Sequence, residues 1–258
     1  MSSAISPSLN QSLPPLDVHA HIDPTVTDAQ LGTLGNAIVF AVTRTLDEAA
    51  QIIPRADARV LWGAGVHPGR RDALEEFDAS RFTKLAGQLD FVGEIGLDRE
   101  QRGPHSIEVL TSAISTAQGL GQLCSVHSTG RQREVVEVAA PNGCGVILHW
   151  FTGSRSLIEQ ASAAGCYFSI NNAMSDAQIT ALPVERLLPE TDYPFTRKAG
   201  SARPGDIAAL EYRCAALLRR SPDEIRQMWY RNLRSAWLDV AQDLSSAPPV
   251  LHRPLTLA

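Results

Sequence analysis

Eight short apolar runs, separated by segments of helical periodicity, are the feature that most constrains the fold of this chain. The runs are LDVHAHI, AIVFAVTR, RVLWGAGVH, FVGEIGLD, QLCSVHS, GVILHWF, CYFSIN and RLLPETD. Between them lie amphipathic stretches such as SIEVLTSAISTAQGLG and SRSLIEQASAAG, which end in Gly, a residue preferred at helix C-caps. Eight strands that alternate with helices in 258 residues predict an α/β fold with a single (β/α)8 TIM barrel. A doubly wound sheet is the alternative, but the chain has no G-x-G-x-x-G motif or P-loop.

The two ends of the chain look different from the barrel. We expect a disordered tail at residues 1–15, a barrel domain with additional C-terminal helices at 16–242, and a polar, Pro-rich tail without periodicity at 243–258. The start has neither a basic nor an apolar segment of a secretory signal, and no apolar run approaches the roughly 20 residues of a membrane span. The four cysteines form no C-x-x-C pair, which is typical of reduced residues in a cytoplasmic protein.

Polar residues that bind metals recur at the ends of the predicted strands. Five of the seven histidines lie there, and the other two, His105 and His252, lie at a helix start and in the tail. Glu94 lies in the fourth strand and Asp192 ends the eighth. Catalytic groups of such barrels gather at the C-terminal ends of the strands, so we expect a site built from these positions. The strand-end histidines are His19, His21, His67, His127 and His149.

The pair His19 and His21 shows why a cation is expected. Residues two apart in a strand point to the same face, so the two imidazoles would project together behind Asp17. Neutral imidazole nitrogens bind metals, and a metal satisfies both rings when they are buried. The simpler alternative is that both are surface polar residues of an alternating strand.

Histidine and carboxylate ligands without thiolates favour Zn²⁺, Mn²⁺ or Mg²⁺ at a hydrolytic site. Two ions about 4 Å apart need a bridging carboxylate, and Glu94, on the fourth strand, is the natural bridge. Asp192 on the last strand lies beside the first strand, where it could bind a metal and accept a proton from the attacking water. A carbamylated lysine is excluded as the bridge, because the only lysines, Lys84 and Lys198, are not at strand ends.

The charge distribution bears on the substrate. A net charge of −5 excludes a globally basic nucleic-acid coat. Eleven basic residues nevertheless follow strand ends, where they would create a local positive field that attracts phosphodiesters, unless these loops are simply hydrophilic. They are Arg44, Arg70, Arg71, Arg99, Arg102, Arg131, Arg133, Arg155, Arg197, Lys198 and Arg203. Trp150 and Tyr193 are candidates to stack a terminal base, with packing in the core as the alternative.

Six motifs, in order, resemble those of the TatD family of metal-dependent hydrolases: DVHAHID, GVHP, GEIGLD, SVHS, LHWFTGS and ETDYP. The resemblance implies a TIM barrel and a divalent-metal DNase, usually a 3′ exonuclease. It implies that His19, His21 and Asp192 hold one metal, that His127 and His149 hold the second, and that Glu94 bridges, with Asp192 as the base. His67 resembles a residue that either contacts the substrate or supports a metal ligand. The chain departs from the family at Arg99, Thr129 and Trp150, and its loop after ETDYP is more basic.

Together these patterns predict an enzyme with two divalent ions that cleaves DNA at single-stranded or frayed ends, with RNA as an alternative substrate. Substrate contacts are expected from His67, Trp150, Tyr193 and three arginines, Arg99, Arg131 and Arg197. Two other readings remain open. One is a deacylase that acts on an aminoacyl nucleotide or tRNA, and the other is a nuclease subunit of an operon-encoded bacterial defence complex.

Overall fold

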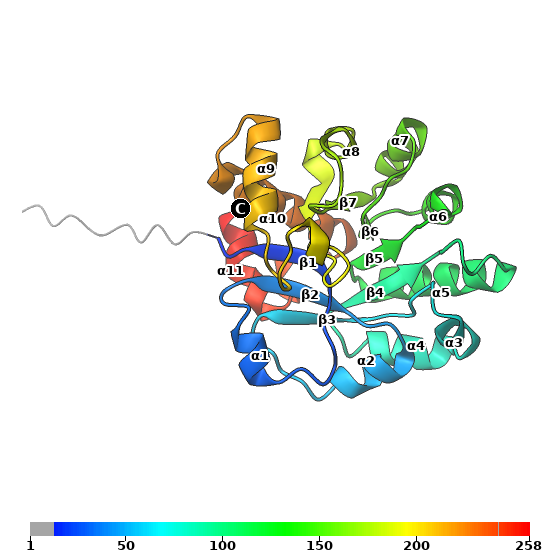
Figure 1. Ribbon diagram of the computed structural model, residues 1–258. Coiled ribbons are helices and arrows are strands. Elements are labelled where there is room, and N and C mark those ends of the chain that lie inside the picture. Colours follow the sequence, from blue (N-terminus) through cyan, green and yellow to red (C-terminus); the bar gives the residue numbers. More distant parts are fainter. Residues whose placement is uncertain (1–12, 242) are drawn as a thin grey trace, which may run out of the picture.

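The computed structural model describes residues 13–241 and 243–258, and its sheet confirms the predicted barrel (Figure 1). Eight parallel strands pair in the order of the sequence. Backbone hydrogen bonds from Asp192 N to His19 O (2.9 Å) and from His21 N to Tyr193 O (2.8 Å) tie the end of the last strand to the first. The strands are β1 (Leu16–His21), β2 (Ile38–Val42), β3 (Val60–Ala64), β4 (Phe91–Gly96), β5 (Cys124–His127), β6 (Val146–Leu148), β7 (Tyr167–Ile170) and β8 (Leu187–Pro189).

Helices surround the strands (Figure 1). Thr45, Asp78 and Ser154 accept backbone N–H groups as N-caps, and Gly121 and Gly165 end two helices in the left-handed conformation. The helices are α1 (Asp28–Gly32), α2 (Leu46–Ile52), α3 (Arg71–Glu75), α4 (Ala79–Ala86), α5 (Pro104–Leu120), α6 (Gln132–Ala139), α7 (Arg155–Ala164), α8 (Asp176–Thr180), α9 (Ala208–Leu218), α10 (Pro222–Val240) and α11 (Pro249–Leu257). The sequence did not predict the short helices α1 and α3. Three 3-10 turns complete the set: η1 (Val184–Arg186), η2 (Arg197–Ala199) and η3 (Leu244–Ser246).

The core consists of the strand residues and the inner faces of the helices. Phe40 packs against Phe91 with ring centroids 5.1 Å apart, and Phe151 packs against Phe168 at 5.7 Å. A smaller cluster around Trp62 fills the space beside β2 and β3. Because apolar side chains fill the barrel, buried polar groups concentrate where the strands end, and the site is built there.

The C-terminal segment corrects one expectation. Residues 243–258 were expected to lack periodicity, but residues 249–257 form α11. Leu251 and Leu255, four residues apart on one helix face, are fully buried against the core, and Pro249 opens the helix, where it needs no N–H partner. Residues 1–12 of the predicted N-terminal tail lie outside the described residues, whereas Leu13 packs against the core.

Two smaller expectations can also be compared with the structure. The cysteines form no disulfide, and Cys124, Cys166 and Cys214 are buried. Across residues 13–241 and 243–258, no helix combines the length and the apolar character that crossing a bilayer requires.

Candidate metal centre at the C-terminal rim of the barrel

The six predicted metal ligands converge on one place at the C-terminal rim. Strand β1 contributes two of them, and β4 and β5 contribute one each. His149 directly follows β6, whereas Asp192 lies in the loop after β8, beyond Glu190 and Thr191. The side chains of His19, Glu94, His149 and Asp192 are buried. The alternation of the strands explains this arrangement, because His19 and His21 are two residues apart and so share the inner face of β1.

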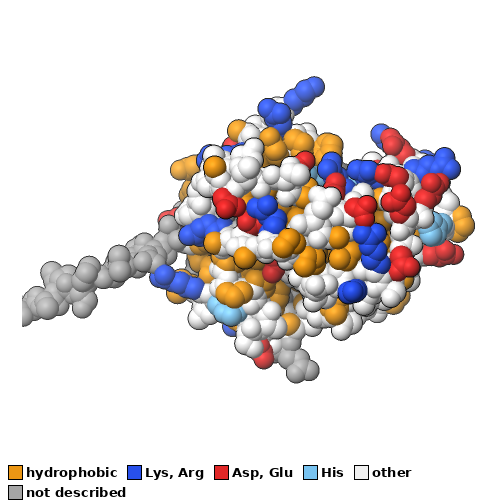
Figure 2. Space-filling view, turned by 90° about the horizontal axis from the view of Figure 1, so that it is seen from below, with side chains coloured by type: hydrophobic (Ala, Val, Ile, Leu, Met, Phe, Trp, Pro, Cys, Tyr) orange, Lys and Arg blue, Asp and Glu red, His pale blue; other side chains and the backbone are white. Residues whose placement is uncertain are grey.

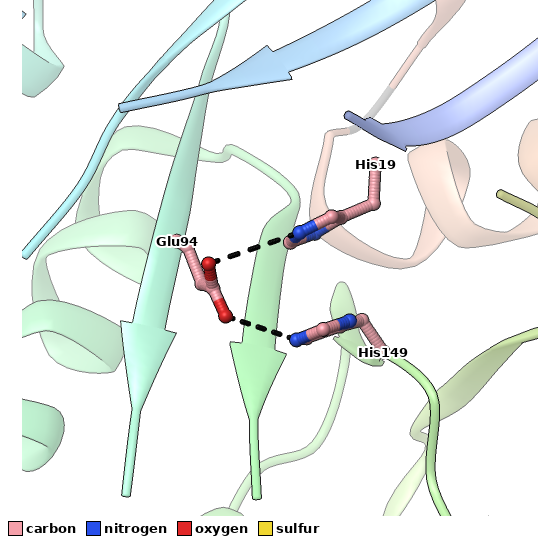
Figure 3. Close-up of side chains that lie close together, drawn as sticks. All are labelled: His19, Glu94 and His149. Carbon is pink, nitrogen blue, oxygen red and sulfur yellow. Dashed lines mark hydrogen bonds and ion pairs between the residues drawn. The ribbon is translucent and has the colours of Figure 1, made fainter. Parts of the chain in front are cut away.

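Glu94 lies at the centre, and its two carboxylate oxygens face different histidines, with His67 Nε2 also 3.4 Å from Oε2. Oε2 lies 3.2 Å from His21 Nε2 and 3.8 Å from His19 Nε2. Oε1 lies 2.9 Å from both His127 Nδ1 and His149 Nε2. Figure 3 shows His19 and His149 approaching opposite oxygens of Glu94. A carboxylate placed in this way has the geometry of a bridge between two cations.

Asp192 completes one side of the cluster. Its Oδ1 lies 3.7 Å from the Nε2 atoms of both His19 and His21. We call His19, His21 and Asp192 the β1/β8 set, and His127 and His149 the β5/β6 set.

The backbone around the centre is shaped to bring these groups together. A Cβ atom added at Gly65 would lie 2.0 Å from Thr43 O and 2.5 Å from Glu94 N, so only glycine lets the end of β3 approach Glu94 this closely. Asp192 has a φ of 45°, in the left-handed region that non-glycine residues rarely adopt. Asp17 accepts hydrogen bonds from Thr191 N (2.8 Å) and Gly205 N (2.7 Å), and thereby anchors β1 to the segment that carries Asp192.

Three further residues contact the ring nitrogens of the histidines that face away from Glu94, and the sequence alone did not single them out. Asp98 Oδ2 lies 2.8 Å from His127 Nε2, and Ser125 Oγ lies 2.7 Å from His19 Nδ1. Glu190 Oε1 is 3.7 Å from His149 Nδ1 and accepts a hydrogen bond from Asn171 Nδ2. Asp98 and Glu190 lie in the quoted motifs GEIGLD and ETDYP, which was the available signal, because metal-binding histidines usually have such partners.

The two sets differ in their electrostatics. Burial, together with neighbouring His149, lowers the pKa of His19 well below its ordinary value, so this imidazole is neutral. Burial would also lower the pKa of His149, but Glu94 and Glu190 outweigh it and raise that pKa well above the ordinary value. His127 follows the same pattern, because Asp98 and Glu94 overcome burial and raise its pKa.

The two central carboxylates are pushed in opposite directions. Burial alone would raise the pKa of Glu94, but the surrounding histidines, His67 and His149 foremost, hold it well below the ordinary value. Burial raises the pKa of Asp192 well above its ordinary value, and Glu190 and Glu94 add to this. An ionised Asp192 at neutral pH therefore requires nearby cations, because burial and the two glutamates act the other way.

Unpartnered atoms test whether the cluster suits a metal. Several buried side-chain atoms here have no hydrogen-bond partner among the described residues, and such atoms are costly unless a ligand satisfies them. They are His19 Nε2, His21 Nδ1, Glu94 Oε2, His149 Nδ1 and Asp192 Oδ1. Three of them, His19 Nε2, Glu94 Oε2 and Asp192 Oδ1, face one another. Imidazole nitrogens and carboxylate oxygens in this arrangement fit a divalent cation.

A cavity of about 480 Å³ opens above the cluster. Seven of the predicted site residues line it: His21, His67, Glu94, His127, His149, Trp150 and Asp192. His67 Nδ1 accepts the Gly69 N–H at 3.0 Å, so the neutral ring carries its proton on Nε2, which lies 3.4 Å from Glu94 Oε2. Residues that the sequence analysis did not propose for the site complete the lining: Asp98, Ser128, Thr129, Gln132, Thr152 and Phe195.

Arg131 does not occupy the position expected of a phosphate ligand. It is buried, and its guanidinium donates to Glu134 Oε1, Gln101 O and Ser106 Oγ. Its donors are therefore used to hold the loop after β5, which argues against a substrate contact from this residue. Arg99 and Arg197 are exposed but do not line the cavity.

Five of the eleven basic residues expected at the rim pair with nearby carboxylates, which weakens the predicted positive field. The pairs are Arg44–Glu48, Arg70–Asp72, Arg71–Glu75, Arg131–Glu134 and Arg155–Glu159. The face shown in Figure 2 likewise has Lys and Arg side chains lying beside Asp and Glu.

Of the two aromatic residues that were expected to stack on a base, one lines the cavity and the other does not. Trp150 lines the cavity, in a left-handed backbone conformation with φ 42°. Tyr193 instead packs against the cluster around Trp62, and the cation of Arg197 lies 5.9 Å from its ring centroid. Phe195, two residues further on, takes the place in the cavity that we expected for Tyr193.

A (β/α)8 barrel with histidines and carboxylates converging at its C-terminal rim defines the class of metal-dependent hydrolases. A family model described as TatD related DNase matches residues 16–238. The chain belongs to this TatD family of metal-dependent hydrolases, as the sequence motifs predicted.

Individual relatives agree with this assignment. An uncharacterized metal-dependent hydrolase TatD from Mycobacterium tuberculosis is 27% identical over 256 residues, which cover 86% of this chain and 97% of the relative. A 3′-5′ ssDNA/RNA exonuclease TatD from Cronobacter sakazakii is 27% identical over 247 residues, with 87% and 90% covered. Among solved structures, YJJV, a TatD homolog from Escherichia coli, superposes with a TM-score of 0.70 at 17% identity, covering 85% of this chain and 97% of that one, and supports the fold.

Proposed function

We propose that the chain is a divalent-metal-dependent DNase that removes nucleotides from the 3′ end of single-stranded or frayed DNA. The observation that carries the proposal is the position of Glu94, whose two oxygens face two separate histidine pairs. This arrangement supports a pair of divalent ions of the kind that phosphodiesterases use. The names of relatives such as the Cronobacter sakazakii exonuclease support single-stranded DNA as the substrate, with RNA as the alternative.

In this proposal the β1/β8 set and Glu94 would hold one ion, and the β5/β6 set and Glu94 would hold the other. The donor atoms suit Zn²⁺, Mn²⁺ or Mg²⁺. Bound there, the ions supply polarisation of a phosphodiester oxygen and activation of water. His67 points its Nε2–H into the cavity, and burial lowers its pKa, so it acts as a neutral hydrogen-bond donor to a phosphate oxygen.

Asp192 accepts the proton of the attacking water. Its Oδ1 has no partner among the described residues, and it lies in the cavity beside the β1 histidines. Burial raises its pKa, which makes the ionised carboxylate a stronger base, while positive charge nearby favours its ionised form.

A deacylase that acts on an aminoacyl nucleotide or tRNA is the second candidate. The observation in its favour is that neither Lys nor Arg occurs among the described residues that line the cavity. An ester carbonyl has less negative charge than a phosphodiester and needs no cationic partner at this position. Asp192 and Glu94 would take the same roles.

Metal add-back with labelled oligonucleotides tests the proposal. After exhaustive chelation we expect no hydrolysis, and addition of Zn²⁺, Mn²⁺ or Mg²⁺ should restore release of a 3′-terminal mononucleotide, with a ladder of shortened products from a 5′-labelled strand. Elemental analysis should give up to two ions per chain. Full activity after chelation, or hydrolysis of aminoacyl esters alone, would contradict the nuclease proposal. A protein partner encoded in the same operon and a cytoplasmic location remain predictions, which genomic neighbourhood and cell fractionation test.

A further inference from the structure

One wall of the cavity consists of uncharged polar side chains from the loops after β5 and β6. Thr129, Gln132 and Thr152 line it. Gln132 is partly buried at the first residue of α6, and its Nε2 donates to Thr152 Oγ1 at the long distance of 3.5 Å. The carbonyl oxygen and the second N–H of this amide have no hydrogen-bond partner among the described residues, so they remain available to a ligand.

A separate wall, from the loop after β8, presents an aromatic ring. Phe195 is 65% exposed, which is unusual for a phenylalanine, and it lines the same cavity. Its ring meets the ring of His21 edge to face, at a centroid distance of 5.3 Å and an angle of 81°. Its backbone N–H donates to Asp192 O at 2.8 Å. The ring is therefore fixed beside two proposed metal ligands while much of its surface faces solvent.

We infer that this cavity is a subsite for the terminal nucleobase, with Phe195 stacking on its face and Gln132 hydrogen bonding to its edge. A base has apolar faces and a polar, uncharged edge, and these two walls match that combination. The lining without Lys or Arg suits a base better than a second phosphate. Because Glu94 and Asp192 line the same cavity, a base held here places its phosphodiester near the proposed metal ligands. The inference rests on the proposed function.

The subsite would explain a preference for single-stranded or frayed ends. A terminal base reaches Phe195 only after it leaves its neighbour in the stack, and this costs least where it is unpaired. Stacking tolerates every base, whereas an amide that reads the edge distinguishes among them. Phe195 therefore sets whether a base is bound, and Gln132 sets which base is preferred.

A double-mutant cycle, in which the Phe195 ring and the terminal base of the substrate are removed separately and together, tests the stacking. We would measure kcat/KM for one oligonucleotide with an intact 3′-terminal base and for the same strand with an abasic 3′ end. Phe195→Ala should lower kcat/KM about tenfold for the intact strand and leave the abasic strand unchanged. Phe195→Trp should retain the discrimination. Tyr212→Ala is the matched control, because Tyr212 is 69% exposed on α9 and does not line the cavity.

A second readout does not depend on turnover. A strand with 2-aminopurine at its 3′ end should gain fluorescence when it binds the wild type, because the base leaves its neighbour in the stack, and this gain should disappear in Phe195→Ala but not in Tyr212→Ala. Gln132→Leu should change the ranking of the four terminal bases, whereas Gln160→Leu, at an exposed position on α7, should not. Metal content equal to that of the wild type would exclude an indirect effect of Phe195→Ala through His21.

The outcomes separate the two proposals. Equal cleavage of intact and abasic strands by the wild type overturns the base subsite and leaves the nuclease intact. The same loss on both strands in Phe195→Ala also overturns it. If the metal-loaded wild type cleaves no oligonucleotide at all, the proposed function fails, and the inference fails with it.

Discussion

The β1/β8 set and the β5/β6 set share Glu94 but are held in different ways. Each histidine has one ring nitrogen turned away from Glu94, which we call its outer nitrogen. In the β5/β6 set, this nitrogen faces a carboxylate, that of Asp98 for His127 and that of Glu190 for His149. In the β1/β8 set, His19 faces the neutral hydroxyl of Ser125. The outer nitrogen of His21, Nδ1, has no partner among the described residues.

This difference assigns different tasks to the two sides. A carboxylate behind an imidazole orients the ring and makes it a better metal ligand, and it raises the pKa of His127 and His149. The β1/β8 set combines an imidazole of lowered pKa, His19, with Asp192, the strong base. We therefore expect the β5/β6 side to bind its cation more tightly and the β1/β8 side to carry the proton transfer.

Replacing the shared residue should have the largest effect. Glu94→Gln keeps the size of the side chain but removes the charge that faces both histidine sets, so both ions should bind more weakly and hydrolysis should fall further than with any other single replacement, by more than about 10³-fold. Elemental analysis and single-turnover cleavage would measure this. Glu185→Gln, at an exposed position before β8, is the matched control. Two retained ions with full turnover would show that Glu94 is not the bridge.

Asp192→Asn should affect chemistry more than binding. The amide still offers an oxygen to a cation but accepts no proton, and the loss of a general base typically costs about 10²- to 10⁴-fold in rate. Binding of the 3′-labelled oligonucleotide should persist, because the cavity walls and the β5/β6 set are unchanged. Near-normal cleavage would remove Asp192 from the mechanism. Loss of both binding and cleavage would make it a residue that only holds the metal.

The sequence predicted the barrel and the cluster of polar residues at its rim because both depend on local patterns. Eight apolar runs specify eight strands, and the period of two in a strand predicts that His19 and His21 share one face. Side-chain directions within loops follow no such period. Tyr193 and Phe195 are two residues apart in one loop, yet only Phe195 lines the cavity, because the left-handed turn at Asp192 redirects the chain.

Arg131 shows a second limit of the sequence. Its basic charge was visible, but its partners Gln101, Ser106 and Glu134 lie 30, 25 and 3 residues away, and only the fold shows that they occupy its guanidinium. Phosphate contacts from all three arginines, Arg99, Arg131 and Arg197, would make DNA affinity fall steeply with salt. With Arg131 buried, only Arg99 and Arg197 remain for this role, so the dependence should be shallower.

Replacing the residues that contact the outer nitrogens of the histidines tests the difference between the two sets directly. Asp98→Asn removes the carboxylate behind His127, and changes of this kind typically weaken metal affinity about 10- to 100-fold. Ser125→Ala removes only a neutral partner of His19 and should weaken binding less. Titration of each variant with Zn²⁺ would give both affinities. Equal losses in the two variants would show that the two sides do not differ as proposed.

The smallest expected effect concerns folding stability as a function of pH, measured in a chelator so that no cation competes for the ring. The hydrogen bond with His127 lowers the pKa of Asp98, so its contribution is present above the ordinary aspartate pKa and is lost as the pH falls through the lowered value. Asp98 and Glu94 overcome burial to raise the pKa of His127, so its contribution is present below the ordinary histidine pKa and is lost as the pH rises through the raised value.

Both contributions are complete only between about pH 4 and 6.5, the ordinary values for the two side chains. Because both side chains line the cavity and keep a small exposed fraction, solvent partly screens the pair, and its contribution there should be about 1 kcal/mol. Urea unfolding of wild type and Asp98→Asn should therefore show the largest gap in unfolding free energy near pH 5.5 and a smaller one at pH 9. Ser125→Ala, which removes no charge, should give a gap with little dependence on pH. A gap for Asp98→Asn that stays constant from pH 5.5 to 9 would mean that the carboxylate does not stabilise a charged His127, and the electrostatic difference between the two sets would then rest on Glu190 alone.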